Sequence, residues 1–339
     1  NMKILKFSNF DIKKNFRWFY NCDYKLYFGL IENGHAVYQF SNRDIARQQS
    51  IFKSRFGAKT KLNRKLIECC RQLRPELLII GLEPMIENST LQQIKEELGV
   101  KLIHFNVDAF WIERNYNMLL KRSEIMDAIF VTTAGDALNE LKQNCPKTSF
   151  IPNPVIKSVD KYKCFENNNP EYDFFFGGSN EKRVKNTEYL INALPDAKFN
   201  ILGQKEKPLT YGQKYWDELT KCIIGLNFPQ MEEDEYQPYL YSSDRIAQYM
   251  GNGLMTVIHS KTGYADYFEP NEEALFYKDI KELAEMLQEL ILNKEKVKNI
   301  AEKGWKKYHM LYNAKAITQY MVDVLLDRKY SNDYAWPVI

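Results

Sequence analysis

The sequence predicts an α/β protein made of two doubly wound domains, each with a parallel sheet between layers of helices. The chain has 339 residues, which is long for a single domain. Strand-sized apolar runs alternate with helix-sized amphipathic segments in both halves, as expected for parallel strands joined by right-handed crossovers. Pro152-Asn153-Pro154 interrupts this alternation near the middle, because two prolines remove backbone donors and end any regular element.

In the first half, short apolar runs are expected to form strands and longer periodic segments to form helices. The run Glu76–Gly81 follows Pro75 and is apolar enough to be a buried strand. A helix at Phe16–Ile31 is expected to end at Asn33-Gly34. The other expected strands are Lys3–Phe7, His35–Phe40, Lys101–Asn106, Ile129–Thr133 and Ser149–Ile151, and the other helices are Lys61–Leu73, Thr90–Leu98, Ser123–Ala128 and Asp136–Gln143.

In the second half, the alternation restarts after a polar linker that ends at Pro170. The tail from Ile280 to Arg328 is almost continuously helical. We therefore expect domains at residues 1–158 and 159–315, a final helix within 316–339, and a cleft at the carboxyl ends of the strands. The expected strands are Asp173–Phe176, Lys198–Leu202, Ile223–Phe228, Leu254–His259 and Ala274–Tyr277, and the helices before the tail are Thr187–Leu194, Tyr215–Lys221 and Ser243–Met250.

The net charge of +3 is unevenly distributed. Residues 1–158 hold 24 Lys+Arg and 16 Asp+Glu, a net +8, whereas residues 159–339 hold 23 and 28, a net −5. This asymmetry indicates an anionic partner for the first half, or chance clustering of lysines on a solvated surface. No apolar run reaches the roughly 18–20 residues that span a bilayer. The start lacks a signal-peptide layout, and the six cysteines form no C-x-x-C pair, so we expect a cytoplasmic protein.

One segment of the second half has the residue types and charge that bind phosphate at a helix end. Ser242 or Ser243 is expected to cap a helix, and Arg245 lies near the N-terminus of that helix. A cation there is unfavourable unless a bound anion attracts both the guanidinium and the helix dipole, so Arg245 indicates a phosphate site. The alternative is a surface arginine paired with Asp244. Gln248 shares the face of Arg245 and could bond a ribose or sugar hydroxyl.

Two glycine-containing turns are weaker candidates for the same ligand. Gly177-Gly178-Ser179 follows a buried strand, where glycines let backbone N–H groups approach a phosphate and Arg183 adds charge. Gly263 and Tyr264 follow another strand and could present backbone N–H groups to a phosphate or a sugar. An ordinary βα turn is the alternative in both cases.

Three side chains in or after strands of the first half are candidates for a general base. Glu83, His104 and Asp108 could deprotonate an acceptor hydroxyl at the carboxyl end of the sheet. Asp108 could instead cap the next segment. The acidic run at residues 232–235 is expected to be a solvated loop, and no His/Cys cluster has metal-ligand spacing.

The order of these motifs resembles one family along nearly the whole chain, the CgeB-like glycosyltransferases, which are related to the group-1 transferases of GT-B fold. The upstream half is similar at Pro75–Gly81, Asn106–Asp108, Met126–Val131 and Ile151–Pro154. The motifs of the second half are Tyr172–Ser179 with Arg183, then Ile224-Gly225-Leu226-Asn227, Ser243-x-Arg245-x-x-Gln248-x4-Gly253, Gly263-x-x-Asp266-Tyr267-Phe268-x-Pro270-x-Glu272 and His309-x-x-Tyr312.

The resemblance implies two Rossmann-like domains of a GT-B enzyme, facing across a cleft, and a nucleotide-sugar donor held mainly by the second domain. It implies that Arg183 and Arg245 neutralise the donor phosphates and that Gly178-Ser179 lines the nucleotide site. It also implies transfer without a bound metal or cofactor, because cationic side chains and a helix end stabilise the leaving group. Relatives usually have Glu where this chain has Gln248, and retention or inversion stays open. Their final helix crosses back onto the first domain.

The leading hypothesis is therefore a glycosyltransferase that acts on a surface glycan or glycolipid. The acceptor, or an anionic membrane at the inner membrane face, would contact the basic first domain near Lys13, Lys14, Arg17 and Trp18. The second hypothesis is a sugar-nucleotide epimerase, or a catalytically silent sugar-binding partner in a glycan-assembly complex. A nucleic-acid partner is a third class, which the sequence disfavours because it contains no recognition-helix or base-stacking motif.

Overall fold

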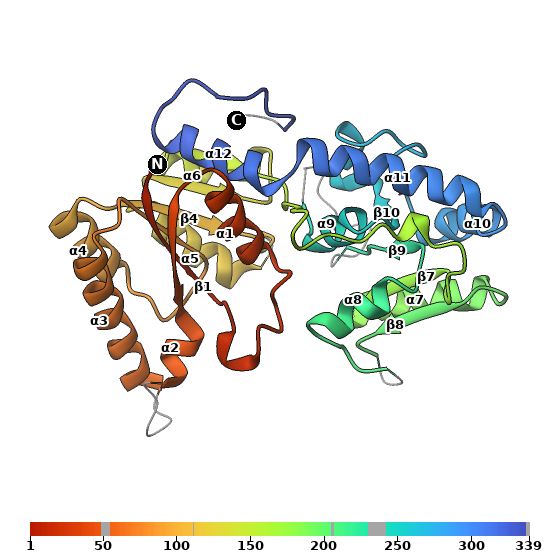
Figure 1. Cartoon of the computed structure of the whole chain (residues 1–339), viewed down its shortest axis with the longest axis horizontal. Helices are drawn as coiled ribbons and strands as arrows, with labels where there is room; N and C mark the ends of the chain where they lie inside the picture. Colours follow the sequence, from red (N-terminus) through yellow and green to blue (C-terminus); the bar gives the residue numbers. More distant parts are fainter. Residues whose placement is uncertain (49–54, 111, 205–206, 230–241, 337–339) are drawn as a thin grey trace. The chain divides into compact units, whose positions relative to one another are not determined.

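The computed structural model describes residues 1–48, 55–110, 112–204, 207–229 and 242–336. It divides into two compact units, shown in Figure 1: unit 1 comprises Asn1–Pro154 and Ala314–Ile339, and unit 2 comprises Val155–Asn313. Each unit contains one parallel sheet with helices, which confirms the predicted α/β class. The expected boundaries, 158/159 and 315/316, differ from these by a few residues. Val155 forms a β-bridge with Asn313, so the chain has already entered unit 2 at residue 155.

Unit 1 is built on a sheet of six parallel strands in the order β2-β1-β3-β4-β5-β6. The strands are β1 Lys3–Ser8, β2 Ala36–Ser41, β3 Leu77–Ile80, β4 Lys101–Asn106, β5 Ala128–Val131 and β6 Thr148–Phe150. The helices are α1 Cys22–Glu32, α2 Asn42–Gln48, α3 Arg55–Leu73, α4 Asn88–Leu98, α5 Glu113–Ser123, α6 Asn139–Asn144 and α12 Ala314–Leu325, with 3-10 turns η1 Ile12–Lys14 and η2 Asp136–Leu138.

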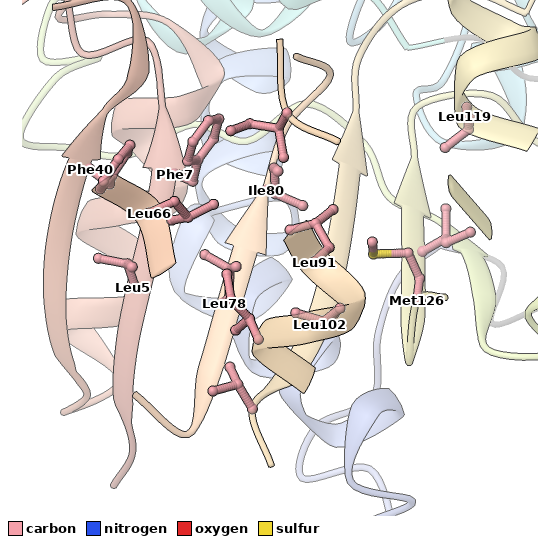
Figure 2. Packing of buried hydrophobic residues seen from close by; sticks show 14 of the residues in the cluster. Leu5, Phe7, Phe40, Leu66, Leu78, Ile80, Leu91, Leu102, Leu119 and Met126 are labelled. Atoms are coloured by element: carbon pink, nitrogen blue, oxygen red, sulfur yellow. The ribbon is translucent and has the colours of Figure 1, made fainter. Parts of the chain in front are cut away.

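Helices α3 to α6 contribute to the buried core on one face of this sheet. Figure 2 shows its centre, where Leu5, Phe7, Leu78 and Ile80 of neighbouring strands meet Leu66 of α3 and Leu91 of α4. Phe7 and Phe40 stack with ring centroids 5.2 Å apart. These side chains alternate along each strand, so the spacing of apolar residues fixes which face carries the core.

Helix α12 belongs to unit 1 although it follows unit 2 in the chain. It packs closely against α1, because Gly29 has no side chain between its backbone and that of Ala314. Its Tyr320 hydroxyl donates to Ser149 Oγ at 3.0 Å, and the Tyr320 ring contacts Phe130 edge-on. The segment after α12 folds back on the helix, where Trp336 packs against Tyr320.

Unit 2 is built on a sheet of five parallel strands in the order β11-β10-β9-β7-β8. The strands are β7 Phe174–Gly177, β8 Phe199–Leu202, β9 Ile224–Leu226, β10 Met255–His259 and β11 Leu275–Tyr277. The helices are α7 Glu181–Ala193, α8 Gln213–Leu219, α9 Asp244–Gly251, α10 Ile280–Leu290 and α11 Lys294–Leu311, with 3-10 turns η3 Cys164–Glu166, η5 Ser260–Thr262 and η6 Tyr264–Asp266.

Several expected elements differ from the structure in their bounds, and three of them differ most. The helix expected from Phe16 begins only at Cys22, because Asn21 caps it by accepting from the N–H of Tyr24 at 3.0 Å. Phe16 itself is left-handed, with φ +57°. The helix expected at Ser123–Ala128 does not form. The helix before β5 is α5, which lies earlier in the chain and ends at Ser123. The almost continuous helix expected from Ile280 is three helices, and the Asn293 side chain caps the second of them.

Candidate functional site

In unit 2, the residues singled out by the sequence gather at the carboxyl ends of β7, β9 and β10 and at the start of α9. Since these strands are parallel neighbours, their carboxyl ends lie at one edge of the sheet. Helix α9 begins after β9 in the chain and ends before β10, so its N-terminus lies at the same edge. This arrangement directs a positive helix end and several polar side chains toward one region.

Arg245, in the first turn of α9, is the most informative of these side chains. Its guanidinium lies over the Phe176 ring, 5.6 Å from the centroid. Its Nη1 atom is buried and has no hydrogen-bond partner among the described residues. A buried guanidinium nitrogen without an acceptor is costly, and the positive end of the helix adds repulsion. An anion bound here would supply the acceptor and remove the repulsion.

Gly178 lies beside Arg245 and keeps the space next to the guanidinium open. A Cβ at position 178 would lie 3.7 Å from Arg245 Nη1 and 3.0 Å from the Phe176 ring. The Gly178 N–H donates to Leu202 O at 3.0 Å, so this amide is already used within the sheet. Ser179 is exposed and borders a surface pocket of about 610 Å³ along β8. The role of glycine at 178 is therefore to leave Arg245 accessible. It does not supply a free backbone N–H group.

Arg183 and Ser243 both contact the segment that follows β9. The Nε of Arg183 donates to Phe228 O at 3.1 Å. Ser243 precedes α9 in an extended conformation, and its hydroxyl donates to Asn227 Oδ1 at 3.2 Å instead of capping the helix. The first turn of α9 therefore has no side-chain cap from Ser243, and its N–H groups remain candidates for a ligand.

Both ends of the Gln248 amide have protein partners. Its Nε2 donates to Asp244 Oδ2 at 2.9 Å, and its Oε1 accepts from the Tyr215 hydroxyl at 2.9 Å. The neighbouring Tyr249 hydroxyl accepts from the N–H of Gly177 at 3.2 Å. Gln248 therefore ties the first turn of α9 to α8 in this structure, a role that the sequence did not indicate.

Gly263 and Tyr264 follow β10, and Tyr264 contacts the residues just before α9. Gly263 is left-handed, with φ +77°, and turns the chain after β10. Tyr264 is buried, and its hydroxyl shares a hydrogen bond with Ser242 Oγ, one residue before the N-cap of α9. Its hydroxyl also bonds that of Tyr308, and burial raises the pKa of Tyr264. The Tyr264 side chain thus holds α9 in place.

In unit 1, Asp108 has the properties expected of a general base. It follows β4 and is half-buried. Its Oδ2 accepts from Asn115 Nδ2 at 2.9 Å, and its N–H donates to Asn106 Oδ1 at 3.2 Å. Burial raises the pKa of the Asp108 carboxyl, and the bond from Asn115 opposes this rise. A carboxylate with a raised pKa accepts a proton more readily than an exposed one.

Glu83 and His104 are placed differently from Asp108. Glu83 is buried after β3, where its carboxylate accepts from Asn42 Nδ2 and from the N–H of Met85 at 3.0 Å. His104 is fully buried within β4 rather than at its end, and neither ring nitrogen has a partner among the described residues. Burial, with the nearby charges of Arg122 and Lys6, holds the pKa of His104 well below its usual value. No hydrogen bond joins Asp108, Glu83 and His104 in the described part of unit 1.

Several polar residues of these sites were not singled out by the sequence. In unit 2 the residue is Tyr215, and in unit 1 they are Asn115 and the buried Arg122. Arg122 donates from Nη2 to Ile86 O at 2.8 Å, and burial lowers its pKa to about 10. Asn227 was part of a family motif and of the strand expected at Ile223–Phe228, but the structure ends β9 at Leu226, so Asn227 follows the strand and its side chain is available to Ser243. The others lie on helices, where no spacing distinguishes them from surface residues.

No group of three or more His, Cys, Asp or Glu with the geometry of a metal site occurs among the described residues. The acidic run at residues 232–235 lies outside them. Among the helices that the structure describes, none combines the length and apolar character needed to cross a bilayer.

The carboxyl-terminal part of the chain matches a known protein family. Residues 183–323 match the family model described as "Glycosyl transferase-like". This range begins at Arg183 and includes Ser243, Arg245, Gln248 and Tyr264. No curated protein sequence matches the chain.

Solved structures share the fold over almost the full length. Sucrose-phosphate synthase (tll1590) from Thermosynechococcus elongatus is 11% identical with a TM-score of 0.63, covering 96% of this chain and 98% of that one. Anabaena Alr3699/HepE in complex with UDP-glucose is 14% identical with a TM-score of 0.58, covering 96% and 100%. A putative UDP-N-acetylglucosamine 2-epimerase from Listeria monocytogenes is 10% identical with a TM-score of 0.59, covering 98% and 99%. The chain has the GT-B fold and is glycosyltransferase-like in the sequence of its carboxyl-terminal part.

Proposed function

We propose that this protein transfers a sugar from a nucleotide-sugar donor to a glycan or glycolipid acceptor. The observation that carries the proposal is the buried Nη1 of Arg245 at the N-terminus of α9, which has no hydrogen-bond partner among the described residues and lies next to the space left by Gly178. That atom fits a phosphate oxygen of the donor. The match to the glycosyl transferase-like family and the UDP-glucose complex of the similar HepE support a nucleotide sugar as the ligand.

The proposed chemistry assigns the leaving group to unit 2. As the bond between the sugar and the diphosphate breaks, negative charge develops on the phosphate oxygens. Arg245, Arg183 and the positive end of α9 stabilise this charge more strongly than that of the intact donor, which lowers the barrier. These cationic groups supply the stabilisation themselves, so we propose that transfer requires no metal or other cofactor.

The proposed acceptor chemistry belongs to unit 1. A sugar hydroxyl becomes a nucleophile when a base removes its proton, and we assign that base to Asp108 because its carboxyl is half-exposed and has a raised pKa. Glu83 is a weaker candidate, since both of its carboxylate oxygens accept hydrogen bonds. The fully buried His104 is weaker still.

The loop before α1 supports an anionic acceptor or an anionic membrane surface as the partner. Lys13 and Lys14 are exposed there, and Ile12 and Phe16 expose 40% and 48% of their surface. Arg17 pairs with Asp11 at 2.5 Å and lies over the Trp18 ring. Exposed lysines beside exposed apolar side chains suit peripheral attachment to anionic lipid. We propose a cytoplasmic, CgeB-like transferase that contacts the membrane through this loop.

A second candidate function is a sugar-nucleotide epimerase, or a silent sugar-binding partner. Epimerase structures of the same fold and the position of Gln248 favour it, because the Gln248 amide bonds Asp244 and Tyr215 instead of a ribose. An epimerase would convert one nucleotide sugar into another without an acceptor, whereas a transferase releases the nucleoside diphosphate. A silent partner would bind the donor and leave it unchanged.

The experiment is a screen of UDP-, GDP-, CMP- and dTDP-sugars with the purified protein, with and without EDTA. Thermal shift detects binding, because a ligand that binds the folded state stabilises it. Release of the nucleoside diphosphate identifies a transferase, and isomerisation of the donor sugar identifies an epimerase. Binding without either product identifies a silent partner. Activity abolished by EDTA and restored by a divalent cation would contradict metal independence.

A variant connects the result with the site. Arg245→Ala removes a charge-assisted bond worth about 1.5–3 kcal/mol, so we expect nucleoside-diphosphate affinity to fall roughly 10- to 100-fold in calorimetry. Lys185→Ala is the matched control, because Lys185 is an exposed cation on another helix, α7, and we assign it no contact with the phosphate. Equal affinities for both variants and the unmodified protein would refute the assigned phosphate site.

A further inference from the structure

Strand β2, residues Ala36–Ser41, forms an open edge of the unit 1 sheet. Within the described residues it pairs only with β1, through the parallel register Lys3↔Ala36 to Ser8↔Ser41. Ala36, Tyr38 and Gln39 are exposed, and Tyr38 exposes 46% of its surface. At six residues, β2 is as long as β1 and β4, and no strand in the described part of the chain is longer.

This edge lacks the features that usually prevent a strand from pairing with another chain. Proteins protect such edges with lysines, prolines, bulges or a covering helix. Between Gly34 and Arg43 there is no Lys, Arg, Asp, Glu or Pro, although unit 1 is rich in lysine and arginine. At the opposite edge of the same sheet, β6 is entirely buried, and Tyr320 of α12 bonds its Ser149. Among the described residues, the two edges of this sheet therefore differ, and β2 is the edge left open.

The backbone of β2 is arranged for one register with a second copy of itself. The N–H of Ala36 donates to Met2 O at 2.9 Å, so alternate residues, Ala36, Tyr38 and Phe40, direct their backbone groups toward β1. Val37 and Gln39 then direct N–H and C=O outward. A two-fold axis through Tyr38 would place each Val37 opposite a Gln39 of the second copy, and these two pairs exchange both of their hydrogen bonds. Tyr38 would face Tyr38 of that copy in a non-hydrogen-bonded pair, where side chains approach most closely.

The charges that flank β2 favour antiparallel over parallel pairing. Glu32 precedes the strand and Arg43 follows it, and both are exposed. Parallel copies would bring the two Arg43 side chains together and the two Glu32 side chains together, whereas antiparallel copies keep each like pair apart. A closed two-fold contact also satisfies both edges at once, so assembly stops at a dimer.

We propose that two copies of this chain dimerise by antiparallel pairing of β2, which joins their unit 1 sheets into one continuous sheet. The proposal does not depend on the proposed function, because it rests on the edge strand alone. Sedimentation velocity over a concentration series is the first test. We expect a species of twice the 40.1 kDa chain mass. A mass of one chain at every concentration overturns the proposal.

Two matched variants test whether β2 is the interface. Tyr38→Lys places a charge at the centre of the pairing and is expected to shift the mass to that of one chain, with the far-ultraviolet circular dichroism spectrum of the folded protein unchanged. Tyr189→Lys is the control, because Tyr189 of α7 is similarly exposed at 40% but lies in unit 2, and this variant is expected to stay dimeric. A Tyr38→Lys protein that remains dimeric overturns the proposal.

Disulfide trapping tests the register. Tyr38→Cys is expected to form a covalent dimer on oxidation, because the two introduced thiols face each other across the axis. Gln39→Cys is expected to form none, because its thiol faces Val37 of the second copy. The six native cysteines contribute equally to both variants. Equal covalent dimer in the two variants overturns the register, and its absence in Tyr38→Cys overturns the pairing.

Discussion

Asp108 is the residue that most directly predicts how the activity depends on pH. Burial favours its neutral form, and one hydrogen bond from Asn115 partly restores the charged form. A base works only while it is deprotonated. Activity is therefore expected to fall as the pH drops through the raised pKa of Asp108, at a higher pH than for an exposed aspartate.

We predict that Asp108→Asn lowers kcat by about 10²- to 10⁴-fold, because it removes the base and keeps the shape. Donor binding, which we propose for unit 2, is expected to stay unchanged. Asn115→Ala removes the bond that lowers the pKa, so the acid limb of kcat/KM is expected to move to higher pH. The pH–rate profiles of the three proteins provide the measurement. Asp136→Asn, at an exposed aspartate, is the control.

A wild-type kcat in Asp108→Asn would refute the assignment of the base. An acid limb that stays in place in Asn115→Ala would show that another group titrates there.

The sequence can point to a candidate site residue when the chemistry of its side chain is unfavourable at its position in a helix or strand. Arg245 is a cation at a helix N-terminus, which is unfavourable without an anion, and this conflict is visible without a structure. The engagement of Gln248 by Asp244 and Tyr215 was not predictable, because Tyr215 lies 33 residues away on another helix. His104 was predicted near the end of its strand, and only the structure shows that its side chain enters the core.

At the scale of elements, the contact of α1 with α12 depends on one glycine. A Cβ at position 29 would lie 2.4 Å from the backbone oxygen of Ala314. Backbone atoms within two packed helices have little freedom to move, so this overlap forces the helices apart.

We predict that Gly29→Ala destabilises unit 1 by about 1–3 kcal/mol, despite the higher helix propensity of alanine. Gly57→Ala is the matched control: Gly57 lies in α3 and has no heavy atom within 4 Å of the added Cβ. This control is expected to lose no stability and to gain up to about 1 kcal/mol. Urea denaturation measures both. Equal stability of the two variants would argue against close packing of α1 on α12.

Strands were predicted more successfully than the ends of helices. An apolar run such as Leu77–Ile80 is a strand because burial on both faces requires it, and this cause is local. Helix ends depend on caps and on tertiary contacts. Asn21 delays the start of α1, and Asn293 divides the terminal helices, although neither residue interrupts the apolar periodicity strongly. Helix α2 was missed, because its seven residues carry too short a pattern.

At the scale of the whole molecule, unit 2 is formed by one continuous segment of the chain, whereas unit 1 is formed by two separate segments. The predicted class of two doubly wound domains is confirmed, since each domain follows from its own alternation of strands and helices. The assignment of α12 to unit 1 does not follow from periodicity, because α10, α11 and α12 have similar amphipathic patterns. The packing of α12 against unit 1, for example at Gly29 and Ser149, distinguishes it.

We predict that a chain shortened to residues 1–313 loses the unfolding transition of unit 1 and keeps that of unit 2. Helix α12 buries Ile317, Tyr320 and Met321, and their loss exposes the apolar surface of unit 1. Calorimetry is expected to leave one transition of about 110 kcal/mol, at ~0.7 kcal/mol for each residue of unit 2. A shortened chain with the full enthalpy of both units would contradict this division.

The return of the chain to unit 1 also has a consequence for biosynthesis. A ribosome makes α12 only after all of unit 2, Val155–Asn313, has been translated. Domains usually mature in the order in which they are made. Here the order is reversed, because the unit begun first waits for a helix made after the second unit. During that interval, the surface of α1 that packs against α12 is uncovered, so we expect the nascent chain to depend most on chaperone protection at this stage.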